Sequence, residues 1–457
     1  MNYATTTVPK KIASESSSSF WNRILFDTVL FGLAGLVIAG IILVKSRTTN
    51  DFFTDPILLT YTFFVTIFQF SRIFSALMYK SSYKTAVNQN KQKEYLQYEP
   101  RVSFVVPCMN ESDAIQNTIQ NCFAAHYPPE KIEVIVINDG STDNSLEKIL
   151  EMKERYPNLI VVDWKQNRGK RHGMAEGFRR STGEIVIQLD SDSYITPHTF
   201  RYFIEPFRNP AVGAVSAHTD PANPDENILT KMQTAYYFMS FRILKAAEST
   251  FHTVFCCSGC ASAYRKSAVM PILDSWLEET FLGLPVTWGD DRAITNWVIK
   301  RGFKTVYTNK VQAYTIVPTK LRQFIKQQIR WKKGWFVNSI FASKFIVKRE
   351  PFVAFTYFFP LMIVTFLTPF MAARAFFYTP IARSPDATLY YVLGVLLITT
   401  LIMIVYRFIA RDNSYWPYLF VWATINTLIL AYLLLFALIT IQNRSWGTRE
   451  GTVNATS

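Results

Sequence analysis

The stretch GEIVIQLDSDSYI, residues 183–195, is a run of apolar, β-favouring residues that ends abruptly in two aspartates, Asp190 and Asp192. The apolar pattern resumes directly afterwards with Tyr194 and Ile195. Two carboxylates at the end of a buried strand can hold a divalent cation through oxygen ligands, and the cation can bridge a diphosphate. An isolated Asp-x-Asp is more often a surface turn, so its meaning depends on the segments around it.

Strand-like and helix-like segments alternate on both sides of this stretch, which predicts an α/β fold with a mainly parallel sheet. The expected strands are residues 101–107, 132–140, 159–164, 184–192 and 212–219, and the expected helices are residues 141–156 and 169–180. In such sheets ligands bind at the carboxyl ends of the strands. Three of these ends carry acids or amides, namely Asn110 and Glu111, Asn138 and Asp139, and Asp190 and Asp192.

Basic residues near the same strand ends suggest an anionic ligand. Lys170 and Arg171, in the segment NRGKRHG, are expected to neutralise charge on the phosphate side of the site. No G-x-G-x-x-G follows the first strand, so a dinucleotide cofactor is not favoured. Because Asp139 ends a second strand, we favour a nucleotide-sugar site over a surface turn for the Asp-x-Asp pair.

The two ends of the chain are strongly apolar, which predicts membrane segments around a soluble middle part. Residues 25–45 and 56–79 are each long enough to cross about 30 Å of hydrocarbon. A buried hairpin of soluble helices is the alternative for these two segments. Near the other end, three further apolar runs cover residues 351–378, 388–408 and 415–441. The last run is long enough for one tilted helix, or for two helices broken near Asn426.

Charge predicts the orientation of the chain and its partners. The net charge is +14, and basic residues flank the first two apolar segments at Lys10, Lys11, Arg23, Lys80, Lys84, Lys91 and Lys93. By the positive-inside rule the N-terminus and the middle part face the cytoplasm. Anionic lipid and an anionic substrate explain the charge better than nucleic acid, because no nucleic-acid recognition motif accompanies it. The five cysteines are expected to be reduced, and their spacing does not fit a zinc site.

An ordered set of motifs resembles a known family. NRGKRHG, LDSDSYI, CCSGCASAYR, FLGLPVTWGDDRAITN, QQIRW and SWGTRE follow one another as in the processive membrane glycosyltransferases of family 2, which include the cellulose, chitin and hyaluronan synthases. The set is most similar to that of the hyaluronan synthases. The resemblance implies a GT-A type α/β domain embedded between transmembrane helices. It also implies an enzyme that takes UDP-sugars, inverts the anomeric carbon and extrudes its polymer through the membrane part.

The resemblance also implies roles for individual residues. It assigns Asp139 to the uridine, Asp190 to the nucleotide, Asp192 to a Mg²⁺ or Mn²⁺ ion on the diphosphate, and Asp291 to the general base. A base suits the reaction because an alcohol is too weak an acid to ionise unaided near neutral pH. The donor-binding set is Asn110, Glu111, Asp139, Lys170, Arg171, Asp190, Gln327, Arg330, Trp446 and Arg449; the acceptor-binding set is Ser258, Gly259, Cys260, Asp290 and Trp331; and the metal ligands are Asp190 and Asp192.

Two segments close to the membrane complete the expected site. Residues 316–350 read as interfacial amphipathic helices, in which Gln327 and Arg330 close over the diphosphate and Trp331 stacks on the acceptor sugar. A tryptophan here could equally anchor in lipid headgroups. The tail motif with Trp446 and Arg449 resembles one that folds back to the nucleotide, which requires a cytoplasmic tail. Three C-terminal crossings would leave the tail outside, whereas four, or a re-entrant last segment, would return it.

The expected organisation follows from these boundaries. It consists of a cytoplasmic N-terminal tail (1–23), a transmembrane hairpin (24–80), a cytoplasmic glycosyltransferase domain (81–315), the interfacial helices (316–350), a C-terminal transmembrane region (351–445) and a cytoplasmic tail (446–457). The expected partners are UDP-GlcNAc, UDP-GlcA, the nascent polysaccharide and membrane lipid, with no nucleic acid. The chain is expected to act as a monomer.

Departures from the family pattern leave the product open. The chain has Ser258, Gly259, Cys260 and Ala261 where hyaluronan synthases usually have S-G-P-L or G-G-P-L, and KKGWFVNS after QQIRW where another sequence is usual. SWGTRE is also familiar from chitin synthases. We therefore expect hyaluronan synthesis and keep chitin or chitooligosaccharide synthesis from UDP-GlcNAc alone as the alternative. A transporter or receptor with a nucleotide-binding domain would leave GDDR and QQIRW without a role.

Overall fold

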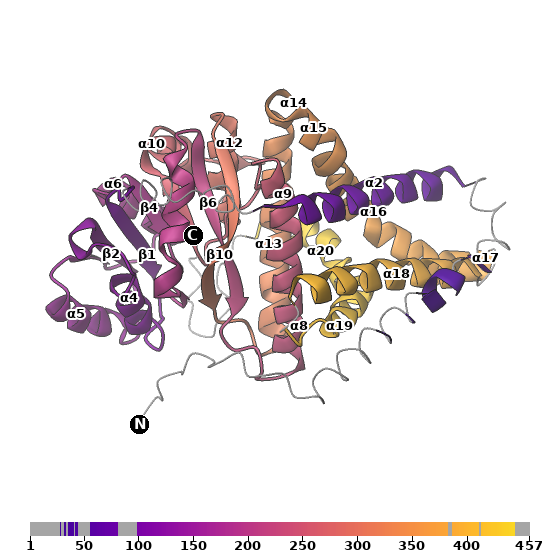
Figure 1. The fold of residues 1–457 in the computed structure, drawn as a ribbon, viewed down its shortest axis with the longest axis horizontal. Coiled ribbons are helices and arrows are strands. Elements are labelled where there is room, and N and C mark those ends of the chain that lie inside the picture. The colour runs from indigo at the N-terminus through magenta and orange to yellow at the C-terminus, as the bar shows by residue number, and fades with distance from the viewer. Residues whose placement is uncertain are drawn as a thin grey trace, which may run out of the picture. The chain divides into compact units, whose positions relative to one another are not determined.

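The computed structural model describes residues 55–80, 98–382, 386–410 and 413–443, together with a few helical positions between residues 28 and 43. The chain divides into two compact units. The larger unit comprises residues 55–372 and the segment from Pro417 onwards, and it contains the sheet (Figure 1) and the residues of the candidate site. The smaller unit comprises residues 1–54 and 373–416 and contains helix α18 (Asp386–Ile409).

An eight-stranded sheet with the order β3-β2-β1-β4-β7-β6-β10-β5 organises the larger unit. The strands are β1 (Val102–Cys108), β2 (Ile132–Asp139), β3 (Leu159–Trp164), β4 (Ile185–Gln188), β5 (Ser193–Ile195), β6 (Val212–Pro221), β7 (Ser262–Arg265) and β10 (Lys304–Thr315). Strands β3, β2, β1 and β4 are mutually parallel, and β6 is parallel to β10. Because β7 pairs antiparallel with both β4 and β6, those two strands run in the same direction. The predicted mainly parallel sheet is confirmed.

Helices cover both faces of this sheet, which explains why its central strands are continuous apolar runs. Successive side chains of a strand point to opposite faces. In β1, Phe104 belongs to the same buried cluster as Ile119, while the next residue, Val105, belongs to the cluster of Met174 on the other face. The helices involved are α4 (Ile115–Phe123) and α5 (Ser145–Arg155) on the first face, and α6 (Lys170–Arg180) and α12 (Asp290–Lys300) on the second.

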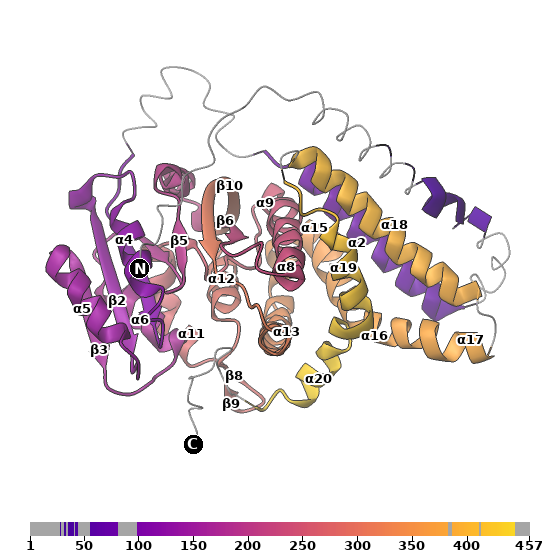
Figure 2. The same ribbon diagram turned by 90° about the horizontal axis from the view of Figure 1, so that it is seen from below.

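Two long helical segments lie beyond the β10 side of the sheet (Figures 1 and 2). One runs from α8 (Ile228–Phe238) through the π-helical segment η5 (Met239–Lys245) into α9 (Ala246–Thr250). The other is α13 (Leu321–Ser343), the helix that carries QQIRW. Met232 of α8 and Phe324 of α13 are fully buried in one cluster with Trp422. The predicted interfacial segment therefore packs partly as core.

Three of the described helices are long and apolar enough to cross a membrane, namely Pro56–Met78 (α2), Pro351–Ala382 and Thr388–Ile409. Large apolar side chains of α2 such as Phe63, Phe70 and Phe74 are more than half exposed, as lipid-facing side chains would be. A fourth apolar segment is bent by 40° between Tyr418–Leu430 and Leu433–Ile439. Of the two alternatives for this segment, the structure has the broken one, with the break a few residues after Asn426. Most of the expected first span, residues 25–45, lies outside the described residues.

Candidate active site

The carboxyl ends of the parallel strands open into a cavity of about 670 Å³. It is lined at one end by Asn110 and Glu111 after β1, by Asp139 at the end of β2 and by Asp190 after β4. The in-register pairing of β1 with both β2 and β4 brings these ends together. The opposite end of the cavity reaches Thr365 on the apolar helix α16 (Phe359–Ala373).

Asp139 is fixed by the loop that precedes α6. Its two carboxylate oxygens accept hydrogen bonds from the backbone N–H groups of Arg168, at 2.6 Å, and Gly169, at 2.9 Å. Burial raises the pKa of Asp139, and these two hydrogen bonds oppose the rise. Gly169 has a φ of +94°, a conformation that only glycine adopts readily, so the loop can present both amides to one carboxylate.

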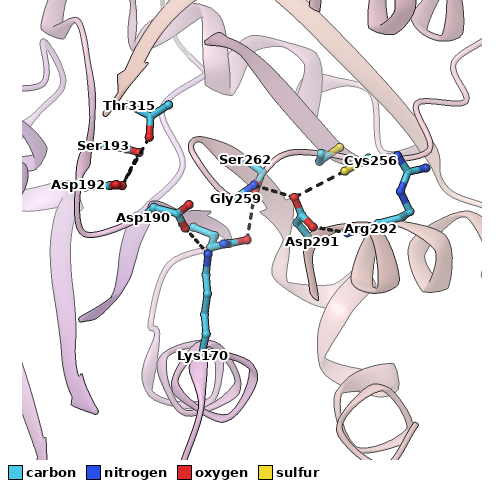
Figure 3. Close-up of polar contacts among 12 residues, drawn as sticks. Lys170, Asp190, Asp192, Ser193, Cys256, Gly259, Ser262, Asp291, Arg292 and Thr315 are labelled. Carbon is cyan, nitrogen blue, oxygen red and sulfur yellow. Dashed lines mark hydrogen bonds and ion pairs between the residues drawn. The ribbon is translucent and has the colours of Figure 1, made fainter. Parts of the chain in front are cut away.

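Asp190 forms an ion pair with Lys170, the first residue of α6 (Figure 3). Burial alone would lower the pKa of Lys170, but the Asp190 carboxylate raises it, so the lysine is charged at neutral pH. The loop before β7 passes close by at Gly259. A Cβ atom on Gly259 would lie 3.1 Å from both Asp190 Oδ1 and Lys170 Nζ, so only glycine leaves the ion pair undisturbed.

Asp192 lies at the opposite side of the Asp-x-Asp turn, where its Oδ1 is 3.3 Å from Ser193 Oγ and 3.5 Å from Thr315 Oγ1 (Figure 3). Among the described residues, no group of three or more His, Cys, Asp or Glu side chains is placed to bind a metal. Two carboxylates fit a hard divalent cation that takes its remaining ligands from water and diphosphate oxygens. The donor set of Asp190 and Asp192 therefore suits Mg²⁺ or Mn²⁺ bound together with a nucleotide.

Asp291 lies in the first turn of α12, where a carboxylate is stabilised by the helix dipole. Its Oδ2 accepts the backbone N–H of Gly259 at 3.1 Å and lies 3.6 Å from Cys256 Sγ. Burial raises the pKa of Cys256 to about 12, so the thiol stays protonated and can donate to the carboxylate. These contacts orient Asp291 while leaving it at the wall of the cavity.

Helix α13 closes the cavity opposite the strand ends and brings Gln327, Arg330 and Trp331 to its wall. It crosses close to the start of α12 because both helices have a glycine there. A Cβ on Gly289, whose φ is +68°, would lie 3.0 Å from the Cα of Gly334. Burial lowers the pKa of Arg330, whereas Asp190, Asp290, Asp291 and Asp192 raise it. Arg330 therefore faces the acids of the site.

Arg171 is the predicted donor-binding residue that the structure does not bring to the cavity. Its side chain is buried, with Nε 2.8 Å from Asp290 Oδ1 and Nη1 3.1 Å from Glu279 Oε2. It also donates to the carbonyl oxygen of Trp276 at 2.9 Å. Asp290 touches the cavity, but its Oδ1 is engaged by Arg171, so the pair anchors the start of α12 beside Asp291.

The other predicted site residues that the structure describes all line the cavity, namely Asn110, Glu111, Asp139, Lys170, Asp190, Asp192, Ser258, Gly259, Cys260, Asp290, Asp291, Gln327, Arg330 and Trp331. Trp446 and Arg449 lie outside the described residues. The cavity is also lined by Tyr236, Lys245, Arg292 and Lys332, to which the sequence analysis assigned no role in the site. Lys245 donates to the Cys256 carbonyl at 2.6 Å and to Ser258 Oγ at 2.5 Å. The sequence around Lys245 contains no motif that would indicate a site residue, whereas Arg292 is part of the GDDR motif.

The arrangement joins three chemical functions in one cavity: acids and a lysine suited to a metal-bound diphosphate, a carboxylate held on a helix N-terminus, and an aromatic wall of Tyr236, Trp331 and Trp335. Tyr236 stacks on Trp422 with ring centroids 3.8 Å apart. Aromatic faces of this kind suit the C–H faces of sugar rings. The geometry fits transfer of a group from a nucleotide at one end to an acceptor at the other.

Comparison with known proteins gives a consistent result. A model of the Glycosyl transferase family 2 matches residues 103–273. The chain is 32% identical to a hyaluronan synthase of Streptococcus pyogenes serotype M1 over 77% of this chain and 84% of the relative. It is 29% identical to an N-acetylglucosaminyltransferase of Azorhizobium caulinodans over 79% of this chain and 90% of the relative. The fold is similar to that of a mannosyltransferase from Pyrobaculum calidifontis solved with GDP-Man and Mn²⁺, with a TM-score of 0.55, 20% identity and coverage of 84% of this chain and 98% of that one.

Proposed function

The chain belongs to the family 2 glycosyl transferases, and on that basis we propose that it is a processive membrane polymerase of UDP-sugars. The observation that carries the proposal is the cavity. It extends from Asp139, Asp190 and Asp192 at the sheet, past Asp291, to Thr365 on a helix long and apolar enough to cross a membrane. A chain lengthened at Asp291 would already lie at the entrance to a membrane path.

The proposed reaction uses Asp291 as the general base. An Asp291 oxygen takes the proton of the acceptor hydroxyl, the hydroxyl oxygen forms a bond to the anomeric carbon of the donor sugar, and the bond from that carbon to UDP breaks with inversion. A divalent ion held by Asp190 and Asp192, when bound, supplies positive charge to the departing diphosphate. Lys170 and Arg330 add to that charge from the cavity wall, and Gly259 and Cys256 keep the base oriented.

We propose that the remaining predicted binding residues keep their assigned roles. Asn110, Glu111, Asp139 and Gln327 hold the donor, Ser258, Cys260 and Trp331 hold the acceptor, and Trp446 and Arg449 of the tail approach the nucleotide. Arg171 and Asp290 act through their ion pair, which holds α12 in place. Gln327 Oε1 is buried with no hydrogen-bond partner among the described residues, and this supports a role in holding a ligand.

The last apolar segment supports a tail on the same side of the membrane as the catalytic domain. Lys333 of α13 donates to the carbonyl oxygens of Thr440, at 2.6 Å, and Asn443, at 2.9 Å, so residues 440–443, which follow the bent segment, lie against α13. We infer that the bent segment is re-entrant and that the protein is a multi-pass membrane protein. Its catalytic domain and tail would then be cytoplasmic.

We propose hyaluronan as the product, made from UDP-GlcNAc and UDP-GlcA. The similarity to a hyaluronan synthase over most of both chains favours this product, and similarity to an N-acetylglucosaminyltransferase keeps a chitin-type product as the second candidate. Cations on the acceptor side of the cavity, including Arg292 and Lys332, favour the anionic polymer.

The product assay tests the proposal. Purified protein with Mg²⁺ or Mn²⁺ and both donors is expected to make a polymer that hyaluronidase digests, and either donor alone is expected to give little polymer. Asp291→Asn should retain UDP binding while polymerisation falls by at least about 10²-fold, the usual effect of a positioned base. Asp274→Asn, which changes an exposed acid on α11 (Leu273–Leu277), is the matched control.

Two other results would contradict parts of the proposal. Abundant chitinase-sensitive polymer from UDP-GlcNAc alone would replace hyaluronan with a chitin-type product. Absence of UDP release from any UDP-sugar would favour the transporter or receptor alternative.

A further inference from the structure

The cations that line the cavity differ in what neutralises them. Lys170 pairs with Asp190, and Arg330 faces four aspartates. Lys245 is occupied by the Cys256 carbonyl and the Ser258 hydroxyl. Arg292 also lines the cavity, but its guanidinium makes no ion pair or hydrogen bond with any residue that the structure describes. Apart from Lys332, no other cavity-lining cation in the described part of the chain shares this property.

Glu248 is the acid whose pKa Arg292 influences, but its carboxylate already accepts hydrogen bonds from other groups. Its carboxylate accepts a hydrogen bond from Tyr357 Oη at 3.1 Å and another from the backbone N–H of Phe255 at 3.1 Å. Burial raises the pKa of Glu248, and the charges of Arg292 and Lys245 only partly oppose the rise. No ion pair within 4.0 Å joins Arg292 to Glu248 or to another described acid, so the guanidinium of Arg292 lines the cavity without a direct carboxylate partner among the described residues.

Arg292 lies on the acceptor side of the base. In the close-up, Asp291 lies between Asp190 and Arg292, and the guanidinium extends beside Cys256 (Figure 3). Arg292, Tyr236 and Cys256 line the same cavity. Tyr236 belongs to the aromatic wall of the cavity and stacks on Trp422 of the last apolar segment. An acceptor sugar whose hydroxyl reaches Asp291 would therefore have Arg292 beside it.

We propose that Arg292 binds the carboxylate of a uronic acid at the growing end of the polymer, an inference that rests on the proposed function. A guanidinium presents a planar pair of donors that matches a carboxylate, and the match is lost with a neutral sugar. In a uronic acid the carboxylate is carried on C5, next to the C4 hydroxyl. If the C4 hydroxyl is the one that loses its proton to Asp291, the carboxylate lies one ring atom away. Arg292 is the adjacent residue of the same helix.

The proposed contact acts in only one of two alternating steps. Addition to a chain that ends in a uronic acid uses the contact, because the carboxylate is then beside the reacting hydroxyl. Addition to a chain that ends in an N-acetylated sugar does not use it. Arg292 is thus proposed as a specificity residue that recognises the acceptor end, distinct from the residues that hold the donor.

Single additions to stalled chains test this role. Enzyme carrying its own nascent chain is stalled by withholding UDP-GlcNAc, which leaves uronate-ended chains, or by withholding UDP-GlcA. The missing labelled donor is then added, and incorporation of one sugar is timed. In Arg292→Gln, addition to uronate-ended chains should slow by about 10- to 100-fold, the usual effect of losing a hydrogen bond between charged groups. Addition to chains ended by N-acetylglucosamine should change less than about twofold. Arg292→Lys, which keeps the charge but loses the planar fork, should restore part of the rate.

Arg301→Gln is the matched control, because Arg301 is an exposed arginine at the end of the same helix. Equal slowing of both steps in Arg292→Gln would mean that Arg292 supports Asp291 or the fold, and it would overturn the proposal. Behaviour indistinguishable from Arg301→Gln would overturn it as well. A wild-type enzyme that never incorporates UDP-GlcA would instead disprove the proposed product, and the acceptor role of Arg292 would fall with it.

Discussion

At the scale of single residues, the cavity is lined by acids and by cations that suit different ligands. The acids Asp139, Asp190 and Asp192 terminate or follow strands at the sheet end of the cavity. The cations Arg292 and Lys332 also line the cavity, and neither forms an ion pair with an acid that the structure describes. A metal-bound nucleotide fits the first environment, and a polyanion fits the second. The two aspartates that interrupt the apolar run of residues 183–195 thus line the sheet end of the cavity.

The charge of Lys332 at the cavity wall depends on pH. Burial lowers the pKa of Lys332 to about 8, so the side chain is charged below this pH and loses its charge as the pH rises through it. If the charge helps to retain an anionic chain, product length should fall above about pH 8. Lys332→Arg stays charged throughout this range and should abolish the alkaline loss. Lys332→Gln should give short products even below about pH 8.

Product sizes on gels, measured on matched membrane preparations, check this expectation. Lys344→Gln serves as the control, because Lys344 is exposed at the end of α13. A product length that falls with pH in the same way in the wild type and in Lys332→Arg would assign the dependence to another group.

At the scale of elements, α13 connects the site to the last apolar segment. Its Gly334 allows the close crossing with α12, and the preceding residue, Lys333, caps the chain beyond α20 (Leu433–Ile439) through two carbonyl oxygens. Ile441 is buried in a cluster with Val337 of α13. Helix α13 therefore contacts both α12, which carries the proposed base, and residues 440–443, which follow α20.

Lys333→Met should reveal this second contact. The variant would leave two carbonyl groups near the end of α20 without their donor, a loss that typically costs about 1–3 kcal/mol of stability. We expect a lower melting temperature and faster proteolytic removal of the C-terminal tail than in the wild type. Lys344→Met, an exposed lysine of the same helix, should behave like the wild type in both measurements. Identical melting and cleavage in the two variants would contradict the capping role of Lys333.

The elements also show how far the sequence could be interpreted. The expected strands at 101–107, 132–140 and 159–164 agree closely with β1, β2 and β3, because buried parallel strands have continuous apolar runs that depend little on their partners. Strand β7 was not expected, because its four residues SAYR have no continuous apolar run. The segment is a strand because it pairs antiparallel with β4 and β6, and this pairing cannot be read from the local sequence. The adjacent positions of Lys170 and Arg171 in the sequence also did not predict that both would reach the site. Lys170 lines the cavity, whereas Arg171 is buried and paired with Asp290.

At the scale of the whole molecule, a bound nucleotide should stabilise the larger unit through several elements at once. The residues around the cavity come from β2, the loop after β4, α12 and α13. A ligand that binds only the folded state adds a stability of RT ln(1 + L/Kd), where L is the free ligand concentration. Because Asp190 and Asp192 would meet a diphosphate through a cation, this stabilisation should require a metal.

Thermal unfolding with UDP measures that requirement. At about one hundred times its Kd, UDP with Mn²⁺ should add about 2.7 kcal/mol of stability, and UDP with a chelator should add much less. Asp192→Asn should lose the metal-dependent part and keep the metal-independent part. A full metal-dependent gain in Asp192→Asn would show that this carboxylate is not a ligand of the ion. Asp274→Asn again provides a control with an exposed acid.

The insertion of β7 between β4 and β6 also sets an order of events during synthesis. Strands β1 to β4 are complete at Gln188, whereas β7, which covers the edge of β4, begins only at Ser262. Until then a chain that has begun to fold on the ribosome exposes the open edge of an apolar strand, which can pair with other chains. The acids at the nucleotide end also precede Asp291 in the chain. A nascent chain that has folded through the Asp-x-Asp turn would thus hold the acids proposed to bind the donor before Asp291, the proposed base, has been synthesised.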